Sequence, residues 1–443
     1  MQTLFFWWDY INTIGLKTAK EKSSQWLSIL LLLGMMHIGM DARYRIVSFF
    51  PSREIGFFVL GVAYLVMALL LITPLPAVGR FLVPLDDWIR RTFCPMLVGR
   101  RWWQGGMIGF VVALMIVAGC WLRWLVIRQL PIEPRFADML PLIQGACDTF
   151  LKGANPYGRL FQMPWELPLT FWPGLWLPYL VPTVMSVDIR WVHVGVVVGI
   201  SLIFSCFLWR PGFVASNPNS AIRLAAFSSL FLFLFSSEPI LFSNIAHTPP
   251  QWLWISLLAG SILLKRPCLS AVCLGIVLSG RQTAVVFAPL MAIYWLRVSG
   301  SFRTAAILSV VAGGTFLVIC GPFLFLNPDA FIVAPVQHYA ALGSYDYAQG
   351  AAGFSANTIG LSYMIRSAQI SWLLPIISAL AVLGPWVLAW KRLRSETDVL
   401  LYMGFSAVVV ALTAPIPWHY EYFPAFILIA FAALAAASEE DVV

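Results

Sequence analysis

The sequence predicts an all-α polytopic membrane protein with about twelve transmembrane helices. Hydrophobic residues make up 60% of the 443 residues and charged residues only 11%, and the mean hydropathy is +0.83. These values lie outside the range of soluble domains. Segments such as 111–117 and 425–435 are apolar on every side, whereas a strand of a membrane barrel alternates. The spans are therefore expected to be helices.

Apolar segments long enough to cross a hydrocarbon core of about 30 Å recur along the chain. The N-terminus lacks a basic start and no cleavage site follows its first apolar segment, which is expected to be an uncleaved span. The expected spans lie at 25–40, 55–75, 106–127, 191–209, 222–237, 251–264, 268–280, 283–297, 303–325, 372–390, 398–414 and 420–437.

Basic residues set the expected topology. With a cytoplasmic N-terminus, nearly every basic cluster in a short loop falls inside, as the positive-inside rule requires. Both termini are then cytoplasmic, and we expect a multi-pass protein of the plasma (inner) membrane. The clusters comprise Lys17, Lys20, Lys22, Arg90, Arg91, Arg100, Arg101, Lys265, Arg266, Lys391, Arg392 and Arg394.

The apolar stretch Leu167–Val184 is the exception to this pattern of spans. It contains four prolines, and counting it as a crossing would place the later basic clusters outside. We expect it to be interfacial or re-entrant.

The predicted topology divides the chain into three parts. Residues 1–104 form a two-helix extension with a basic cytoplasmic segment. Residues 105–326 form a core whose large first outer loop, 128–190, contains juxtamembrane helices. Residues 327–443 contain a later outer loop and the C-terminal helices. Chemistry is expected in the outer loops, where polar surface is available.

Several classes of function are not indicated. The net charge of +8 reflects cations at helix ends, so membrane lipids are expected partners and nucleic acid is not. The sequence has no Asp-x-Asp pair, P-loop, HExxH or GxSxG motif. Its five histidines are scattered, so neither a cofactor nor a divalent cation is indicated.

The outer loops resemble those of a known family. Residues 135–146 carry an acid before an amphipathic helix, and Gly-x-Asn-Pro-Tyr follows at 153–157. With segments 274–289, 353–361 and 417–424, this order is similar to that of the GT-C glycosyltransferases. The branch using polyprenyl-phosphate mannose is the most similar. The resemblance covers roughly residues 106–437, and the two N-terminal spans depart from it.

The resemblance implies transfer of mannose or a similar hexose or pentose. The donor is a polyprenyl-phosphate-linked sugar, the acceptor is a lipid or glycan on the outer face, and inversion is expected. It makes Asp138 the catalytic base, whereas position alone equally fits an N-cap of the helix that begins near Met139. Asp148 and Glu133 are the alternative acids, and Asp148 lies close to three helical turns after Asp138.

Arg281, at an outer turn between two apolar runs, is expected to bind the donor phosphate, with Gln282 beside it. The alternative is an arginine that reaches lipid headgroups. His338 is a further candidate for the phosphate. Possible substrate contacts, for which a structural role is the alternative, are Asp148, Glu238, His247, His419 and Tyr420.

Two other functions stay open. A glycan polymerase or ligase would share many spans and large outer loops but typically relies on outer-loop arginines, and the later loop holds only Arg366. A transporter or flippase of lipid-linked saccharides would show inverted repeats and ionisable residues at mid-membrane. No such repeat is evident in this sequence.

Overall fold

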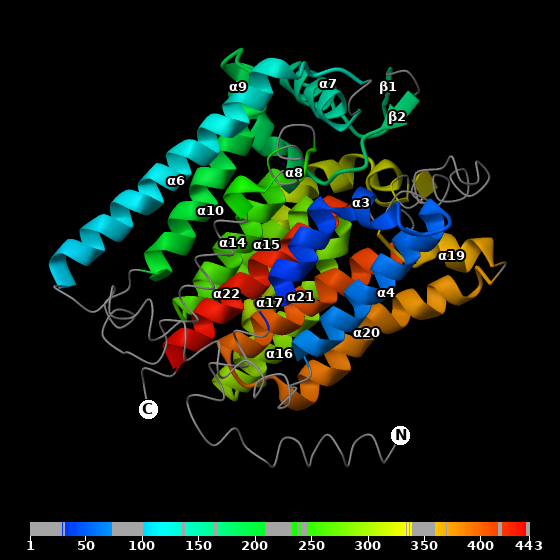
Figure 1. Ribbon diagram of the computed structural model, residues 1–443. Helices are drawn as coiled ribbons and strands as arrows, with labels where there is room; N and C mark the ends of the chain where they lie inside the picture. The colour runs from blue at the N-terminus through cyan, green and yellow to red at the C-terminus, as the bar shows by residue number, and fades with distance from the viewer. Residues whose placement is uncertain are drawn as a thin grey trace.

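The computed structural model shows a bundle of helices with a small platform at one end (Figure 1). In the part of the chain that it describes, the strands are β1 (Leu160–Gln162) and β2 (Glu166–Pro168), which pair antiparallel. The structure describes residues 29, 32–72, 101–134, 138–162, 166–208, 233–236, 240, 246–333, 335, 337–338, 359–368, 370–414 and 419–439.

Most of the predicted spans within the described ranges fall on helices. The predicted span 222–237 lies largely outside the described residues. The segment 106–127 becomes α6, and 398–414 becomes α21. The segment 283–297 is split into a 3-10 turn, η3 (Gln282–Val286), and α16. The long helices are α4 (Arg53–Ile72), α6 (Arg101–Gln129), α10 (Trp191–Leu208), α14 (Pro249–Leu263), α15 (Pro267–Gly280), α16 (Phe287–Ser299), α17 (Phe302–Leu326), α20 (Leu373–Arg392), α21 (Glu396–Thr413) and α22 (Phe423–Glu439).

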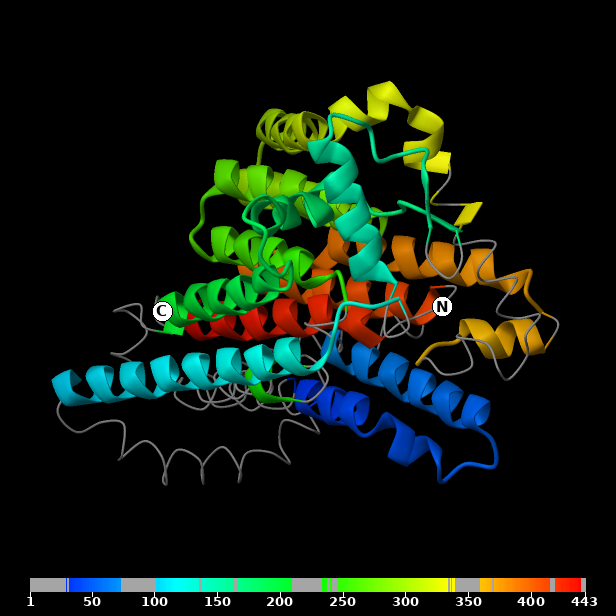
Figure 2. The same ribbon diagram turned by 90° about the horizontal axis from the view of Figure 1, so that it is seen from above.

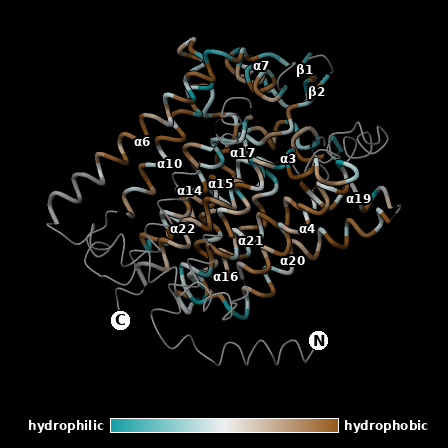
Figure 3. Tube along the Cα trace, in the orientation of Figure 1, coloured by the Kyte–Doolittle hydropathy of each residue, from teal (hydrophilic) through white to brown (hydrophobic). Residues whose placement is uncertain are grey.

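Within these ranges, four helical segments are long and apolar enough to cross a membrane: Gly109–Gln129, Phe302–Leu326, Leu373–Arg392 and Glu396–Thr413. Shorter apolar helices cover Ile55–Leu70, Trp191–Phe207, Pro267–Gly280 and Tyr420–Ala436. Hydrophobic residues follow the helices along most of their length (Figure 3). The class of all-α membrane protein is thus supported, and the count of about twelve spans stays a prediction.

The helices pack into one bundle with a continuous apolar core. Helix α21 lies against α22, α20 and α4, and α15 lies against α14 and α17. Figures 1 and 2 show α6 and α10 along one edge of the bundle. Gly275 permits a close approach, since a Cβ there would lie 2.5 Å from the Ala312 carbonyl oxygen on α17. Small residues commonly serve this purpose between membrane helices.

The N-terminal extension shares this core. The ring of Tyr64 on α4 lies edge-on to Tyr422, with ring centroids 5.3 Å apart. His37 lies 2.5 Å from Ser236 Oγ through its Nε2 atom and packs on Phe426. The basic segment 73–100, which was expected to follow it in the cytoplasm, lies outside the described residues.

Residues 130–190 form the platform. Its elements are α7 (Met139–Leu151), β1, β2, α8 (Pro173–Trp176), the 3-10 turn η1 (Leu177–Tyr179) and α9 (Leu180–Val184). They have their own apolar core, which joins the bundle through Cys320 and Phe323 of α17. The stretch Leu167–Val184 is therefore divided among short elements instead of forming one long helix.

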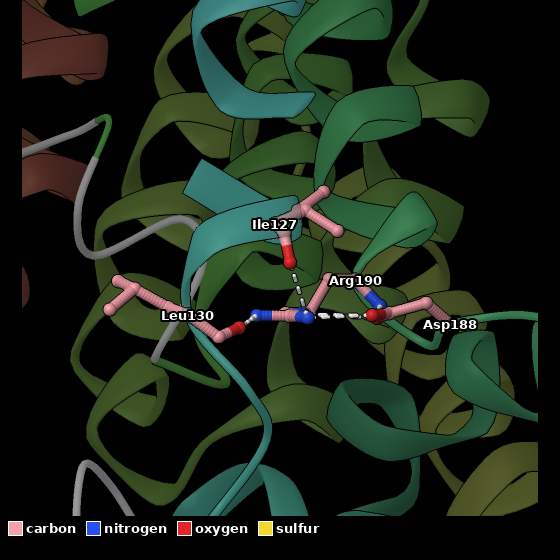
Figure 4. Close-up of polar contacts among 4 residues, drawn as sticks. All are labelled: Ile127, Leu130, Asp188 and Arg190. Carbon is pink, nitrogen blue, oxygen red and sulfur yellow. Dashed lines mark hydrogen bonds and ion pairs between the residues drawn. The ribbon is translucent and has the colours of Figure 1, made fainter. Parts of the chain in front are cut away.

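Arg190 joins the last residues of the platform to the end of α6 (Figure 4). Its Nη1 donates to the Leu130 carbonyl at 2.5 Å and its Nη2 to the Ile127 carbonyl at 2.9 Å, and Asp188 pairs with it at 2.6 Å. A cation there satisfies carbonyls that α6 leaves without partners at its C-terminal end. The end of α6 and the start of α10 consequently lie side by side, so the platform begins and ends at the same end of the bundle.

Candidate functional site

Asp138 immediately precedes α7, as the sequence predicts. Its side chain is half-buried and makes no capping hydrogen bond to the first turn of the helix. Its backbone is already helical, with φ −79° and ψ −19°, and its carbonyl oxygen accepts from the Leu142 N–H at 3.0 Å. An N-cap requires an extended backbone and a side-chain acceptor. The capping role that position alone allowed for this carboxylate is therefore absent.

Helix α7 is amphipathic and lies on the platform core. Leu140, Ile143 and Cys147 are buried on one face, and burial raises the pKa of the Cys147 thiol to about 12. The Asp148 side chain, by contrast, is exposed. Asp138 and Asp148 thus have different surroundings on the same helix.

The Gly-x-Asn-Pro-Tyr motif forms a structural turn. Asn155 Oδ1 accepts from the Tyr157 N–H at 3.1 Å, which is the expected Asx turn. The buried Tyr157 hydroxyl donates to the Phe171 carbonyl at 2.6 Å and accepts from Trp176 Nε1 at 3.1 Å. The motif therefore fixes the fold of the platform.

Several hydrogen bonds fasten the platform to the helix bundle. Trp254 Nε1 on α14 donates to the Gly174 carbonyl at 2.8 Å, and Gln282 Nε2 donates to the Thr170 carbonyl at 2.8 Å. The Tyr179 hydroxyl donates to the His247 carbonyl at 3.1 Å. The Gln282 side chain, expected to accompany Arg281 at a phosphate, thus makes one bond to the platform.

Arg281 is paired with an acid that lies far away in the sequence. Helix α15 ends at Gly280, and Arg281 is extended, with φ −144° and ψ 143°. Its Nη2 lies 3.0 Å from Glu421 Oε1, and the two side chains are only 13% and 14% exposed. In the structure the guanidinium faces a carboxylate, and a largely buried cation is stabilised by such a counter-ion. Its expected contact with a donor phosphate or with lipid headgroups stays a prediction.

The pair borders a cavity of about 40 Å³. Its polar wall includes Gln251 and Thr283, in addition to Arg281 and Glu421. The rest of the wall is apolar, and it is formed by Ile255, Ala284, Val286, Phe287, Ala407, Val410, Ala411 and Pro424. The volume suffices for a few water molecules. The cavity is therefore amphipathic.

Burial shifts the pKa of His247 in this region. Glu421 belongs to η7 (His419–Tyr422), the turn that precedes α22. Burial lowers the pKa of His247 well below its usual value, and Arg281 lowers it further. His247 is therefore neutral at pH 7.

His247 lies under the platform. Its ring stacks on Phe171 with centroids 3.9 Å apart and meets Tyr420 edge-on at 5.9 Å. Among the residues that the structure describes, no hydrogen-bond partner reaches either ring nitrogen, Thr248 Oγ1 or Gln251 Oε1. Buried polar atoms without partners are rare and call for an explanation.

The structure thus gathers Arg281, Gln282, His247 and Tyr420 at the platform end of the bundle. Glu421, which follows the candidate Tyr420 in the sequence, joins them. Asp138 belongs to the platform itself. His338 is half-buried, and burial lowers its pKa. Glu238 and the side chain of His419 lie outside the described residues.

The comparisons with known proteins leave the family open. No family matches this chain. No curated protein and no solved structure matches it either. Across the described ranges, no group of three or more His, Cys, Asp or Glu side chains is arranged to hold a metal ion.

Proposed function

We propose that this protein is a membrane glycosyltransferase that moves a sugar from a polyprenyl-phosphate-linked donor to a lipid or glycan acceptor. One observation carries the proposal. Arg281 lies beside an amphipathic cavity at the same end of the bundle as the platform that holds Asp138. A cation beside an apolar wall suits a phosphate that is attached to a hydrocarbon chain.

The reaction is a direct displacement at the anomeric carbon of the sugar. Asp138 accepts the proton of the acceptor hydroxyl. The new bond forms as the bond to the donor phosphate breaks. Arg281 stabilises the negative charge of the leaving phosphate. A single displacement inverts the configuration of the sugar.

The contacts around Arg281 support a donor that lies across the edge of the cavity. The phosphate would lie beside Arg281 at the polar wall of the cavity. The apolar chain would follow the wall that includes Ile255, Phe287 and Val410. Gln282, held by Thr170 of the platform, links the phosphate side to the acceptor side.

The distribution of charge supports an outer platform. The end of the bundle opposite to the platform carries Lys265, which is 72% exposed and lies 3.7 Å from Glu396. It also carries Arg297, whose Nη2 donates to the Trp390 carbonyl at 2.6 Å. Such a basic end is typical of the cytoplasmic side. We infer that the protein lies in the plasma membrane with the platform outside.

The test is turnover of a lipid-linked donor. Purified protein is incubated with a panel of polyprenyl-phosphate sugars, including mannose, and release of polyprenyl phosphate is measured. The proposal predicts release with at least one sugar and a glycosylated acceptor in native lipid. Transport of the lipid-linked sugar across vesicles without any release would favour a flippase instead.

A further inference from the structure

The cavity at Arg281 contains an unused hydrogen-bond acceptor. Gln251 is only 3% exposed, and its Nε2 donates to the Val277 carbonyl at 3.0 Å. This bond fixes the amide so that Oε1 is the other atom, and Oε1 is without a partner in the described part of the chain. Gln251 lines the same cavity as Glu421. A new hydrogen-bond donor in the cavity could therefore bond to Gln251 Oε1.

Among the described residues that line the cavity, one positive charge faces one negative charge before any ligand enters. Arg281 carries one positive charge and Glu421 one negative charge, 3.0 Å apart. A phosphodiester would add a second negative charge to a site that is largely shielded from water. Two anions sharing one buried cation are unfavourable, and a carboxyl group in such a position takes up a proton. The entering phosphate and the ionised Glu421 therefore compete for Arg281.

We propose that Glu421 is an exchangeable counter-ion: a phosphodiester attached to an apolar chain takes over Arg281, while Glu421 takes up one proton from water and donates a hydrogen bond to Gln251. The proposal rests on the proposed function for the identity of the ligand. In the balance, the carboxylate gains one proton, Arg281 stays charged and no covalent bond changes. On release, Glu421 loses the proton to water and returns to Arg281.

The surroundings of Glu421 favour this exchange. Its side chain is only 14% exposed. Among the described residues, Tyr422 on the same turn and His247, which is neutral, are titratable groups that interact with Glu421 or with Arg281. Arg281 is a cation whose removal from Glu421 would promote protonation. The returning carboxylate would expel the polyprenyl phosphate that the transfer leaves behind.

The test measures protons taken up on binding. The probe is farnesyl methyl phosphate, a phosphodiester that has one fixed negative charge between pH 5.5 and 8.5, so any linked proton enters the protein. Calorimetric titrations of the purified protein in detergent, in buffers of different ionisation enthalpy, give the number of protons. We expect close to one proton per ligand, and an affinity that falls about tenfold for each pH unit above the pKa of the free site.

Variants assign the proton to Glu421. Glu421→Gln should bind the probe without proton uptake, with an affinity that is independent of pH and about tenfold tighter at pH 8. Glu166→Gln, which changes an exposed acid of β2, should behave like the wild type. Dimethyl phosphate lacks the chain and should bind more weakly than the farnesyl diester. Equal binding of the two would contradict the assignment to a lipid.

Three results would overturn the exchange: wild-type binding without proton uptake, equal uptake by Glu421→Gln, or no binding to the wild type. The first and third results are obtained with the wild type alone, so they test the proposal even if a variant misfolds. The proposed function can fail separately. Proton-linked binding without sugar transfer would support the counter-ion exchange and contradict the proposed function. Sugar transfer without linked proton uptake would support the function and contradict the exchange.

Discussion

The Arg281 guanidinium and the Glu421 carboxylate lie 3.0 Å apart, although 140 residues separate them in the chain. The contact joins the turn between α15 and α16 to the turn before α22, and both ends are largely buried. A buried pair is seldom a source of net stability, and removing one partner is more costly than replacing both. The effect of the pair on stability therefore has to be measured separately from its effect on function.

Single and double substitutions of this pair should differ in a definite order. Glu421→Leu leaves a buried guanidinium that cannot lose its charge, and we expect a loss of about 3 kcal/mol. Arg281→Met should cost less, since Glu421 can neutralise itself by binding a proton. The double variant should approach the wild type. Thermal unfolding in detergent, followed by tryptophan fluorescence, gives the order; equal losses in both single variants would contradict it.

Gly174 should be intolerant of a side chain. A Cβ there would lie 2.1 Å from Ser279 Oγ and 2.9 Å from the Ser279 carbonyl carbon, where α8 meets α15. Gly174→Ala should therefore lower stability by about 1–3 kcal/mol. Gly195→Ala is the matched control, because nothing lies within 4 Å of a Cβ at that position. The melting temperatures of the two variants check this, and similar values would argue against close packing of the platform.

Arg190 should hold the platform to the end of α6. Arg190→Met removes both carbonyl contacts and the Asp188 pair. We expect a loss of about 3 kcal/mol and faster proteolysis within residues 130–190. Arg159→Met, at an exposed arginine of the same platform, should change stability by less than about 0.5 kcal/mol. Unchanged proteolysis of Arg190→Met would show that other contacts suffice.

His247 should make the protein less stable in acid. Its pKa is lowered in the folded protein, so its contribution is fully present above the usual value of about 6.5 and is lost as the pH falls below it. There the unfolded chain binds a proton that the folded chain excludes. His247→Phe keeps an aromatic ring against Phe171 and removes this dependence. Melting temperatures between pH 8 and 5 test it; parallel curves for the two proteins would contradict it.

The positions of the helices could be predicted because length and apolarity are local properties. Predicted bounds such as 191–209 and 251–264 lie within a few residues of α10 and α14. The prolines of 167–184 correctly argued against one continuous helix. Cα positions in a helix follow from the adjacent sequence, whereas side-chain partners do not.

The contacts of the site could not be predicted in the same way, because they join side chains that lie far apart in the sequence. Arg281 was recognised as an unusual cation, but its partner lies in another outer turn, and only the folded bundle brings them together. His247 lacked any motif, and its importance arises from burial against Phe171. Buried polar atoms without partners, such as Gln251 Oε1, leave no signal in a sequence.

Removal of the Asp138 carboxylate distinguishes a catalytic base from a structural residue of the platform. Asp138→Asn keeps the size of the side chain but removes the carboxylate that would accept the proton of the acceptor. Asp148→Asn, at an exposed position of the same helix, is the matched control. With a polyprenyl-phosphate sugar that the wild type uses, we expect turnover by Asp138→Asn to fall at least about 100-fold and turnover by Asp148→Asn to stay near wild type. Wild-type turnover by correctly folded Asp138→Asn would contradict the account.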